Sequence, residues 1–266
     1  MDGPSEPPRA PTPLADEGAS GTPAEAPEPA SAPDVLRVTA GVGVVSRTFD
    51  YRDPLSPNLR TYSVPASTLL SASLALLPIG SNEPGAVRAG IAGRYDRSVG
   101  MQSALPDGST TGTSYDRWEA GARVERTPSA GSALGLVGVV ASYGVTRFLL
   151  DEATGAKVLP EAGYGSISLV GDASVRVLGC SLGLAAGGGH VPQAGVTGRR
   201  FPHASGGVAR AAASLTVPLA TRISAQVRGE YERFFLTMNP EPGDRFVAGG
   251  ALDQYLRGGI DVLVHL

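Results

Sequence analysis

The chain has 266 residues and a formal net charge of −3, and Lys157 is the single lysine among its 22 basic residues. Such a balanced charge argues against a nucleic-acid-binding protein. The lone cysteine, Cys180, excludes a disulfide bond within the chain. No signal peptide is recognisable, because no charged region followed by an apolar segment comes after Met1.

Residues 1–34 differ in composition from the rest of the chain. They contain nine of the 22 prolines, seven acidic residues, the one basic residue Arg9 and no aromatic residue. A segment of this kind buries too little apolar area to offset the entropy lost on ordering. We therefore expect a disordered linker over 1–34 and a folded domain over 35–266.

From residue 35 onward the dominant pattern is an alternation of apolar and polar residues with a period of two. In 223–232, for example, Ile223, Val227 and Tyr231 alternate with Ser224, Arg228 and Glu232. This period predicts β-strands with one polar and one apolar face. Ten such runs occur, at 35–51, 61–78, 86–97, 115–125, 133–149, 163–177, 181–190, 205–217, 223–232 and 256–266.

The connections between these runs alternate in length. Short turns are expected near 79–85, 127–132, 178–180 and 218–221, and longer loops near 52–60, 98–114, 150–162, 191–204 and 236–250. Ten up-and-down strands then place the short turns and both termini at one end and the long loops at the other. Bacterial outer-membrane barrels have short periplasmic turns and long extracellular loops. We therefore predict an all-β, antiparallel, up-and-down transmembrane barrel in the outer membrane of a Gram-negative bacterium.

Three alternatives remain at this point. A soluble sandwich or lipocalin-like barrel also alternates, but its strands usually have about 5–6 residues, whereas a tilted membrane strand needs about 9–11. Residues Ser132–Leu150 are long and apolar enough for a membrane helix, although glycine and valine are frequent in them. The strand count could also be eight or twelve, because the run at 181–190 is short.

The aromatic residues gather near the long-loop ends of the predicted strands. Amphipathic rings prefer the boundary between membrane and water, so we expect an outer aromatic girdle. Its predicted members are Tyr51, Tyr62, Tyr95, Tyr115, Trp118, Tyr143, Tyr164, Tyr231 and Tyr255.

The polar phase of the strands is rich in charge and would line the lumen. The predicted lining residues are Arg37, Arg88, Arg94, Arg117, Glu119, Arg123, Glu125, Asp172, Arg176, Arg210, Arg228, Glu230, Arg257 and Asp261. A barrel of about ten strands is narrow enough for side chains to fill. We therefore expect a largely plugged lumen and a structural, anchoring or surface-binding role. The alternative is a narrow, weakly anion-preferring pore.

Enzymatic activity is not expected. A hydrolase would need a nucleophile beside a base, and the alternative candidates are His190 and His203, with Ser205 near the second. Asp151 and Glu152 alone supply too few oxygen ligands for a calcium site. We predict no catalytic residue, no metal site and no cofactor.

The C-terminal residues Arg257-x-Gly259-x-x-Val262-x-Val264 resemble the terminal-strand signal of outer-membrane barrels, although the last residue is Leu266 rather than an aromatic one. The stretch 238–255 is similar to the last loop and strand of a family of uncharacterised outer-membrane β-barrels from myxobacteria-like organisms. The resemblance implies a fold and a location but no activity. Members of the family often carry periplasmic domains before the barrel, which would suit a linker at 1–34. As partners we expect outer-membrane lipid, lipopolysaccharide and the barrel-assembly machinery, and no nucleic acid.

Overall fold

The computed structural model describes residue 3 and residues 35–56, 59–81, 83–105, 108–129, 132–151 and 160–266. By its contacts the chain divides into two units, Met1–Ala32 and Pro33–Leu266. Apart from residue 3, the linker expected over 1–34 lies outside the described residues, so the account below concerns the second unit.

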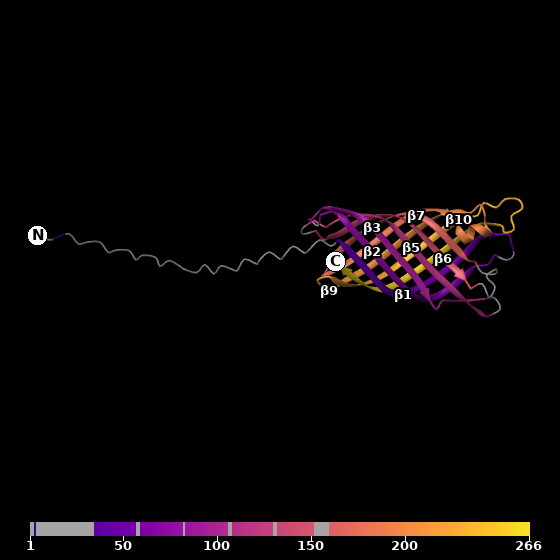
Figure 1. Ribbon diagram of the computed structural model, residues 1–266, viewed down its shortest axis with the longest axis horizontal. Coiled ribbons are helices and arrows are strands. Elements are labelled where there is room, and N and C mark those ends of the chain that lie inside the picture. The colour runs from indigo at the N-terminus through magenta and orange to yellow at the C-terminus, as the bar shows by residue number, and fades with distance from the viewer. Residues whose placement is uncertain are drawn as a thin grey trace. The chain divides into compact units, whose positions relative to one another are not determined.

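The second unit consists almost entirely of strands (Figure 1). Its elements are β1 (Leu36–Pro54), β2 (Tyr62–Gly80), β3 (Val87–Val99), β4 (Gln102–Ala104), β5 (Thr110–Arg126), β6 (Leu134–Leu150), β7 (Ala162–Val177), β8 (Cys180–Gln193), α1 (Gly195–Arg200), β9 (Ser205–Ala220), β10 (Ile223–Thr237) and β11 (Ala248–His265).

Ten of these strands form a closed antiparallel barrel. Each strand pairs with its sequence neighbours, β3 pairs with β5, and β1 closes the sheet by pairing with β11. The short β4 lies outside this order and forms a hairpin with Thr110–Gly112 of β5. The predicted ten-stranded up-and-down barrel is thus confirmed, and closure into one sheet rules out a two-sheet sandwich.

The segment considered as a membrane helix is strand β6, which is in register with β5 on one side and β7 on the other. Within the described part of the chain, no helix is long and apolar enough to cross a membrane.

The alternation in the sequence becomes the two faces of the barrel wall. In β10, Val227 and Tyr231 are exposed, whereas Ser224, Glu230 and Glu232 are buried. Charged residues therefore face inward and apolar residues face outward, the reverse of a soluble barrel. The ten barrel strands have 13–19 residues each, which exceeds the span of about 9–11 residues that a tilted membrane strand needs.

Local chemistry explains the turns and the one proline within β2. Leu178 and Gly179 join β7 to β8 with positive φ values of 50° and 81°, as a two-residue type I′ hairpin requires. The pairing of β1 with β2 shifts between Val45 and Arg47. Pro65 lies opposite this shift, where its missing N–H removes no regular ladder hydrogen bond.

The short connections all lie at one end of the barrel, together with the start of β1 and the end of β11, where Leu36 and Leu266 exchange backbone hydrogen bonds. The longer connections and α1 lie at the opposite end (Figure 1). Two strands begin earlier than the alternation predicts, β5 at Thr110 and β11 at Ala248. Beyond the membrane a strand no longer needs one apolar face, so the alternation fades before the hydrogen-bonded ladder ends.

Candidate functional site

The outer surface of the barrel is apolar along most of its height. Val42, Leu184 and Ile260 are about 60% exposed, and similar residues occupy the outward positions of the other barrel strands. Exposure of so much apolar surface to water is unfavourable, whereas its contact with lipid tails is favourable. Barrel closure also leaves no unpaired strand edge in the hydrocarbon. The chain is an outer-membrane β-barrel, with its short turns on the periplasmic side and its long loops on the extracellular side.

The predicted aromatic girdle is divided between two sides of the wall. Tyr95, Trp118, Tyr143 and Tyr231 lie on the outer surface, each between 36% and 43% exposed.

The girdle assignment is wrong for Tyr62, Tyr115, Tyr164 and Tyr255, which are at most 6% exposed and lie inside the barrel. Tyr51 is half-buried and packs against interior aromatic residues as well. The inward orientation of Tyr115 and Tyr255 could have been read from the sequence. Each precedes an inward arginine by two residues and therefore lies on the same face of its strand.

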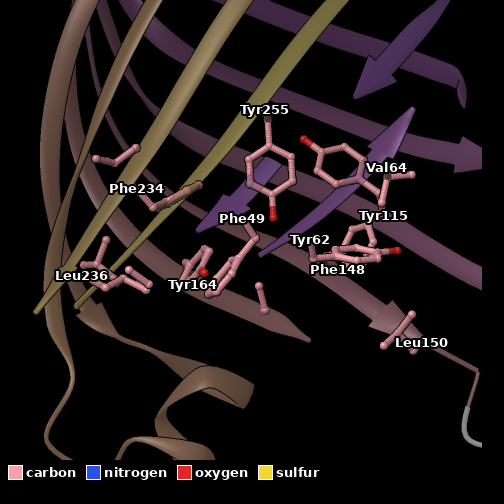
Figure 2. Close-up of a cluster of buried hydrophobic side chains, with 14 of the residues drawn as sticks. Phe49, Tyr62, Val64, Tyr115, Phe148, Leu150, Tyr164, Phe234, Leu236 and Tyr255 are labelled. Carbon is pink, nitrogen blue, oxygen red and sulfur yellow. The ribbon is translucent and has the colours of Figure 1, made fainter. Parts of the chain in front are cut away.

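Buried aromatic and aliphatic side chains fill the extracellular half of the lumen. Figure 2 shows these side chains projecting from several strands into one cluster. The ring centroids of Tyr164 and Phe234 are 4.4 Å apart, those of Tyr115 and Tyr255 are 5.3 Å apart, and Phe148 lies 6.0 Å from Tyr62. We call this cluster the aromatic plug, with the members Phe49, Tyr62, Val64, Tyr115, Phe148, Leu150, Tyr164, Phe234, Leu236 and Tyr255.

One buried ion pair lies within the aromatic plug. Arg47 donates from Nε and Nη2 to the two carboxylate oxygens of Asp253, each at 2.8 Å. The hydroxyls of Tyr164 and Tyr255 also donate to Asp253, at 2.9 and 3.0 Å. The sequence analysis did not assign Asp253 to the lumen, although it shares the face of Tyr255.

A larger charged network lies next to the plug on its periplasmic side. Arg210 donates to Glu232 at 2.7 Å and to Glu119 at 2.9 Å. Arg257 donates to Glu232 at 3.0 Å and also contacts the Tyr115 hydroxyl, at 2.6 Å. Residues from β5, β9, β10 and β11 are therefore joined across the lumen.

The network continues toward the periplasmic end through further arginines. Arg94 pairs with Asp96 at 3.0 Å and with Glu230, and Arg228 pairs with Glu230 and with Asp261, each at 2.5 Å. Arg117 also pairs with Asp96 and Glu119.

A second charged cluster surrounds Glu125, which pairs with Arg37, Arg88 and Arg123. Arg123 also pairs with Asp172 at 2.9 Å.

The structure thus brings thirteen of the fourteen predicted lumen residues into ion pairs inside the barrel. The exception is Arg176, whose side chain is exposed at the periplasmic end of β7, one residue before the end of the strand.

The charges of the lumen almost cancel. In the described part of the chain, nine arginines and eight carboxylates form its ion pairs. Buried charges are stable only when they are paired and hydrogen-bonded, and this arrangement satisfies that condition.

The side chains in the periplasmic half of the lumen leave an internal cavity. A cavity of about 420 Å³ lies between the charged clusters, and small side chains such as Ser73, Ala92, Ala185 and Ala212 line part of it. Along β1 the inward residues change from half-buried Thr39 to Val45, which is 1% exposed. The residues that line the cavity extend from Arg37 and Thr39, near the periplasmic end, to Arg257 beside the aromatic plug, and they include no member of the plug.

The histidines considered for hydrolysis lie near the extracellular ends of β8 and β9. His190 is exposed on β8, and His203 Nε2 lies 3.6 Å from a carboxylate oxygen of Glu241. The Ser205 hydroxyl accepts from Asn239 at 3.3 Å. Asp151 is exposed, and Glu152 lies outside the described residues. Within the described ranges, no group of three or more His, Cys, Asp or Glu side chains is placed to hold a metal ion.

Comparison with known proteins identifies similar barrels but no family. No protein-family model matches the chain, and no curated protein matches it. Among solved structures, the chain is similar to the outer membrane protease OmpT from Escherichia coli, with 11% identity, a TM-score of 0.46, and coverage of 88% of this chain and 97% of the other. It is also similar to the translocator domain of the autotransporter NalP from Neisseria meningitidis, with 13% identity, a TM-score of 0.37 and coverage of 89% and 90%. For an anion-selective porin from Comamonas acidovorans the identity is 9%, the TM-score 0.27 and the coverage 86% and 98%.

Proposed function

We propose that this protein is a closed outer-membrane barrel that anchors its long loops at the cell surface and does not conduct ions in its resting state. The observation that carries this proposal is the aromatic plug. Tyr115, Phe148, Tyr164, Phe234 and Tyr255 are completely buried in the extracellular half of the lumen, so water does not reach their rings, which supports a closed lumen.

The charged networks support the same function. Many pores that prefer one sign of ion use rings of charged side chains along their path. Here the arginines that line the cavity, such as Arg94, Arg123 and Arg210, already donate to carboxylates. The narrow anion-preferring pore would therefore require both the plug and these pairs to rearrange.

A further alternative is a translocator, a barrel through which a passenger segment of the same chain crosses the membrane. The filled lumen argues against this function as well. An α-helix with its side chains is about 10–12 Å wide. The side chains of the plug and of the networks occupy the space through which such a helix would pass.

We also propose that the chain is not a hydrolase. The support is that the two side chains have other partners: His203 Nε2 lies beside a carboxylate oxygen of Glu241, and the Ser205 hydroxyl accepts from Asn239.

Planar-bilayer recording tests the closed state. We expect the folded wild-type protein to show no steady conductance. The double variant Phe148→Ala/Phe234→Ala removes two buried rings of the plug and should show channel openings, because the cavity below already reaches the periplasmic end.

The control is Phe235→Ala. Phe235 follows Phe234 in β10 but is 41% exposed on the outer surface, so this variant should remain as silent as the wild type. Heat-modifiable migration in SDS gels verifies that each protein is folded. Steady conductance of the wild-type protein would overturn the closed state and favour the pore.

A further inference from the structure

Two rows of side chains face outward on three adjacent strands near their extracellular ends. The first row contains Tyr95 of β3, Trp118 of β5 and Tyr143 of β6, and the rings of Trp118 and Tyr143 are 5.6 Å apart. The second row lies two residues closer to the long loops on β3 and β5 and four residues closer on β6. It contains Arg97, Asp116 and Arg147, and Asp116 is in register with both arginines.

The position of these rows along the strands gives their depth in the membrane. On the periplasmic side of the aromatic row, the outward residues are apolar, and Ile91, Val124 and Val139 are between 43% and 58% exposed. Exposed Tyr and Trp side chains lie at the boundary between hydrocarbon and water. The guanidinium groups of the second row are therefore at the height of the lipid headgroups in the outer leaflet.

These two arginines differ from those in the lumen. Within the described residues, neither Arg97 nor Arg147 has a carboxylate within 4.0 Å, and both side chains are exposed. Asp116 leaves the row with one excess positive charge. A guanidinium is suited to phosphate because its parallel N–H groups can donate to two phosphate oxygens at once.

We propose that Arg97 and Arg147 bind the phosphates of an outer-leaflet glycolipid, whose acyl chains lie along the apolar face of β3, β5 and β6. The arginines are two strands apart, which places their Cα atoms about 10 Å from each other. A headgroup with two phosphates can therefore engage both. This proposal deepens the expected contact with lipopolysaccharide and rests on the membrane orientation, not on whether the lumen conducts.

Arg233 of β10 is another outward arginine near the extracellular end, but its surroundings differ. Its guanidinium lies 5.1 Å from the ring centroid of Phe235, and its Nε is buried. No second outward arginine is in register beside it on β9 or β11, where Ala209 and Gln254 occupy the paired positions. The pair on β3 and β6 is therefore the better phosphate site.

The natural reporter for this site is Trp118, the single tryptophan of the chain, which lies in the aromatic row between the two arginine strands. Folded protein in detergent micelles is titrated with bisphosphorylated lipid A while the Trp118 emission is recorded. We expect the Trp118 emission to shift as lipid A is added and the shift to saturate. Inorganic phosphate at millimolar concentration should not produce it, because a free ion lacks the acyl chains that lie on the strands.

Three variants separate lipid recognition from general damage to the barrel. Arg97→Gln and Arg147→Gln should each weaken lipid A binding about fivefold, the loss expected for one basic residue at an anionic membrane surface. Asp116→Asn should tighten binding, because it removes a negative charge between the two guanidinium groups. Arg126→Gln should bind like the wild type, since Arg126 is an exposed outward residue at the periplasmic end of the same strand β5.

The proposal is overturned if both arginine variants bind lipid A within twofold of the wild type. It is also overturned if dephosphorylated lipid A binds equally well, or if Asp116→Asn weakens binding as the arginine variants do. A conducting wild-type barrel that still shows these lipid effects would reject the closed state without affecting the lipid site.

Discussion

Among the ion pairs of the described residues, that of Arg47 and Asp253 has the least exposed side chains. Arg47 is 1% exposed and Asp253 is 0% exposed. Arg47 also donates to the carbonyl oxygen of Pro160 at 2.9 Å, and its guanidinium lies 4.0 Å from the ring centroid of Phe148. All of its polar contacts depend on groups brought from distant parts of the chain.

Replacement of Asp253 should therefore be costly. In Asp253→Ala the Arg47 guanidinium stays buried without its carboxylate, and the Tyr164 and Tyr255 hydroxyls lose their acceptor. Loss of one partner of a buried ion pair typically costs about 3–5 kcal/mol. We expect a decrease of that size in the free energy of unfolding, measured by urea titration of the refolded protein.

The matched control is Glu241→Ala, which removes the carboxylate beside His203. That pair is 3.6 Å apart, and its side chains are 40% and 65% exposed. Exposed pairs contribute about 0–1 kcal/mol. Equal losses in the two variants would show that burial of the Arg47 pair does not determine its contribution.

Among the elements, β1 and β11 decide whether the sheet closes. Gly43 of β1 pairs with Gly259 of β11, and a Cβ at Gly43 would lie 2.8 Å from the Gly259 Cα. The backbone of the two strands must approach closely at this point. Glycine is used where no side chain fits between such strands.

We expect Gly43→Ala to weaken barrel closure, because the added methyl group must push β1 away from β11. The measurement is the temperature at which the folded band converts to the unfolded band in SDS gels, which should fall.

Gly229→Ala in β10 is the control for this change, since its Cβ would have no atom within 4 Å. It should leave the conversion temperature unchanged or raise it slightly, because alanine lowers the entropy of the unfolded chain. A fall of the same size in both variants would contradict the importance of the β1–β11 contact.

At the scale of the whole molecule, the ten strands form a complete closed sheet over Leu36–His265. Residues 1–34 are acidic and proline-rich, and they contain no alternating apolar run. Proline cannot donate a ladder hydrogen bond. We therefore predict that the segment contributes nothing to the stability of the barrel.

Deletion of residues 1–34 should leave the thermal transition and the protease resistance of the refolded barrel unchanged. Both are compared with those of the full chain in the same detergent. A large loss of stability in the shortened protein would assign the segment a structural part in the barrel.

Much of the fold could be predicted from the sequence. The period of two in runs such as 223–232 specifies which residues face lipid and which face the lumen, because successive side chains of a strand point to opposite sides. The alternation of short and long connections specifies the up-and-down order and the two ends. The inward charges of Arg117, Glu230 and Arg257 were visible for the same reason.

The interior could be predicted only in part, because a tyrosine suits both an interface and a plug. Tyr95 and Tyr115 lie at similar distances from the long loops, yet one faces outward and the other is buried. Residue type alone does not separate them. Their distances in sequence from Arg94 and Arg117 separate them. A residue an odd number of positions from an inward arginine on the same strand faces outward, and a residue an even number of positions away faces inward.

The sequence by itself determined the strands, their two faces, the ends of the barrel and the presence of charge in the lumen, since all of these follow from local alternation and loop length. Only the tertiary structure decided which charges meet and where the lumen is sealed. Arg37 and Glu125 are 88 positions apart, and Arg47 and Asp253 are 206 apart. Such partners are set by the tilt and stagger of the closed sheet. Closure also brings rings from seven different strands, from β1 to β11, into a single plug.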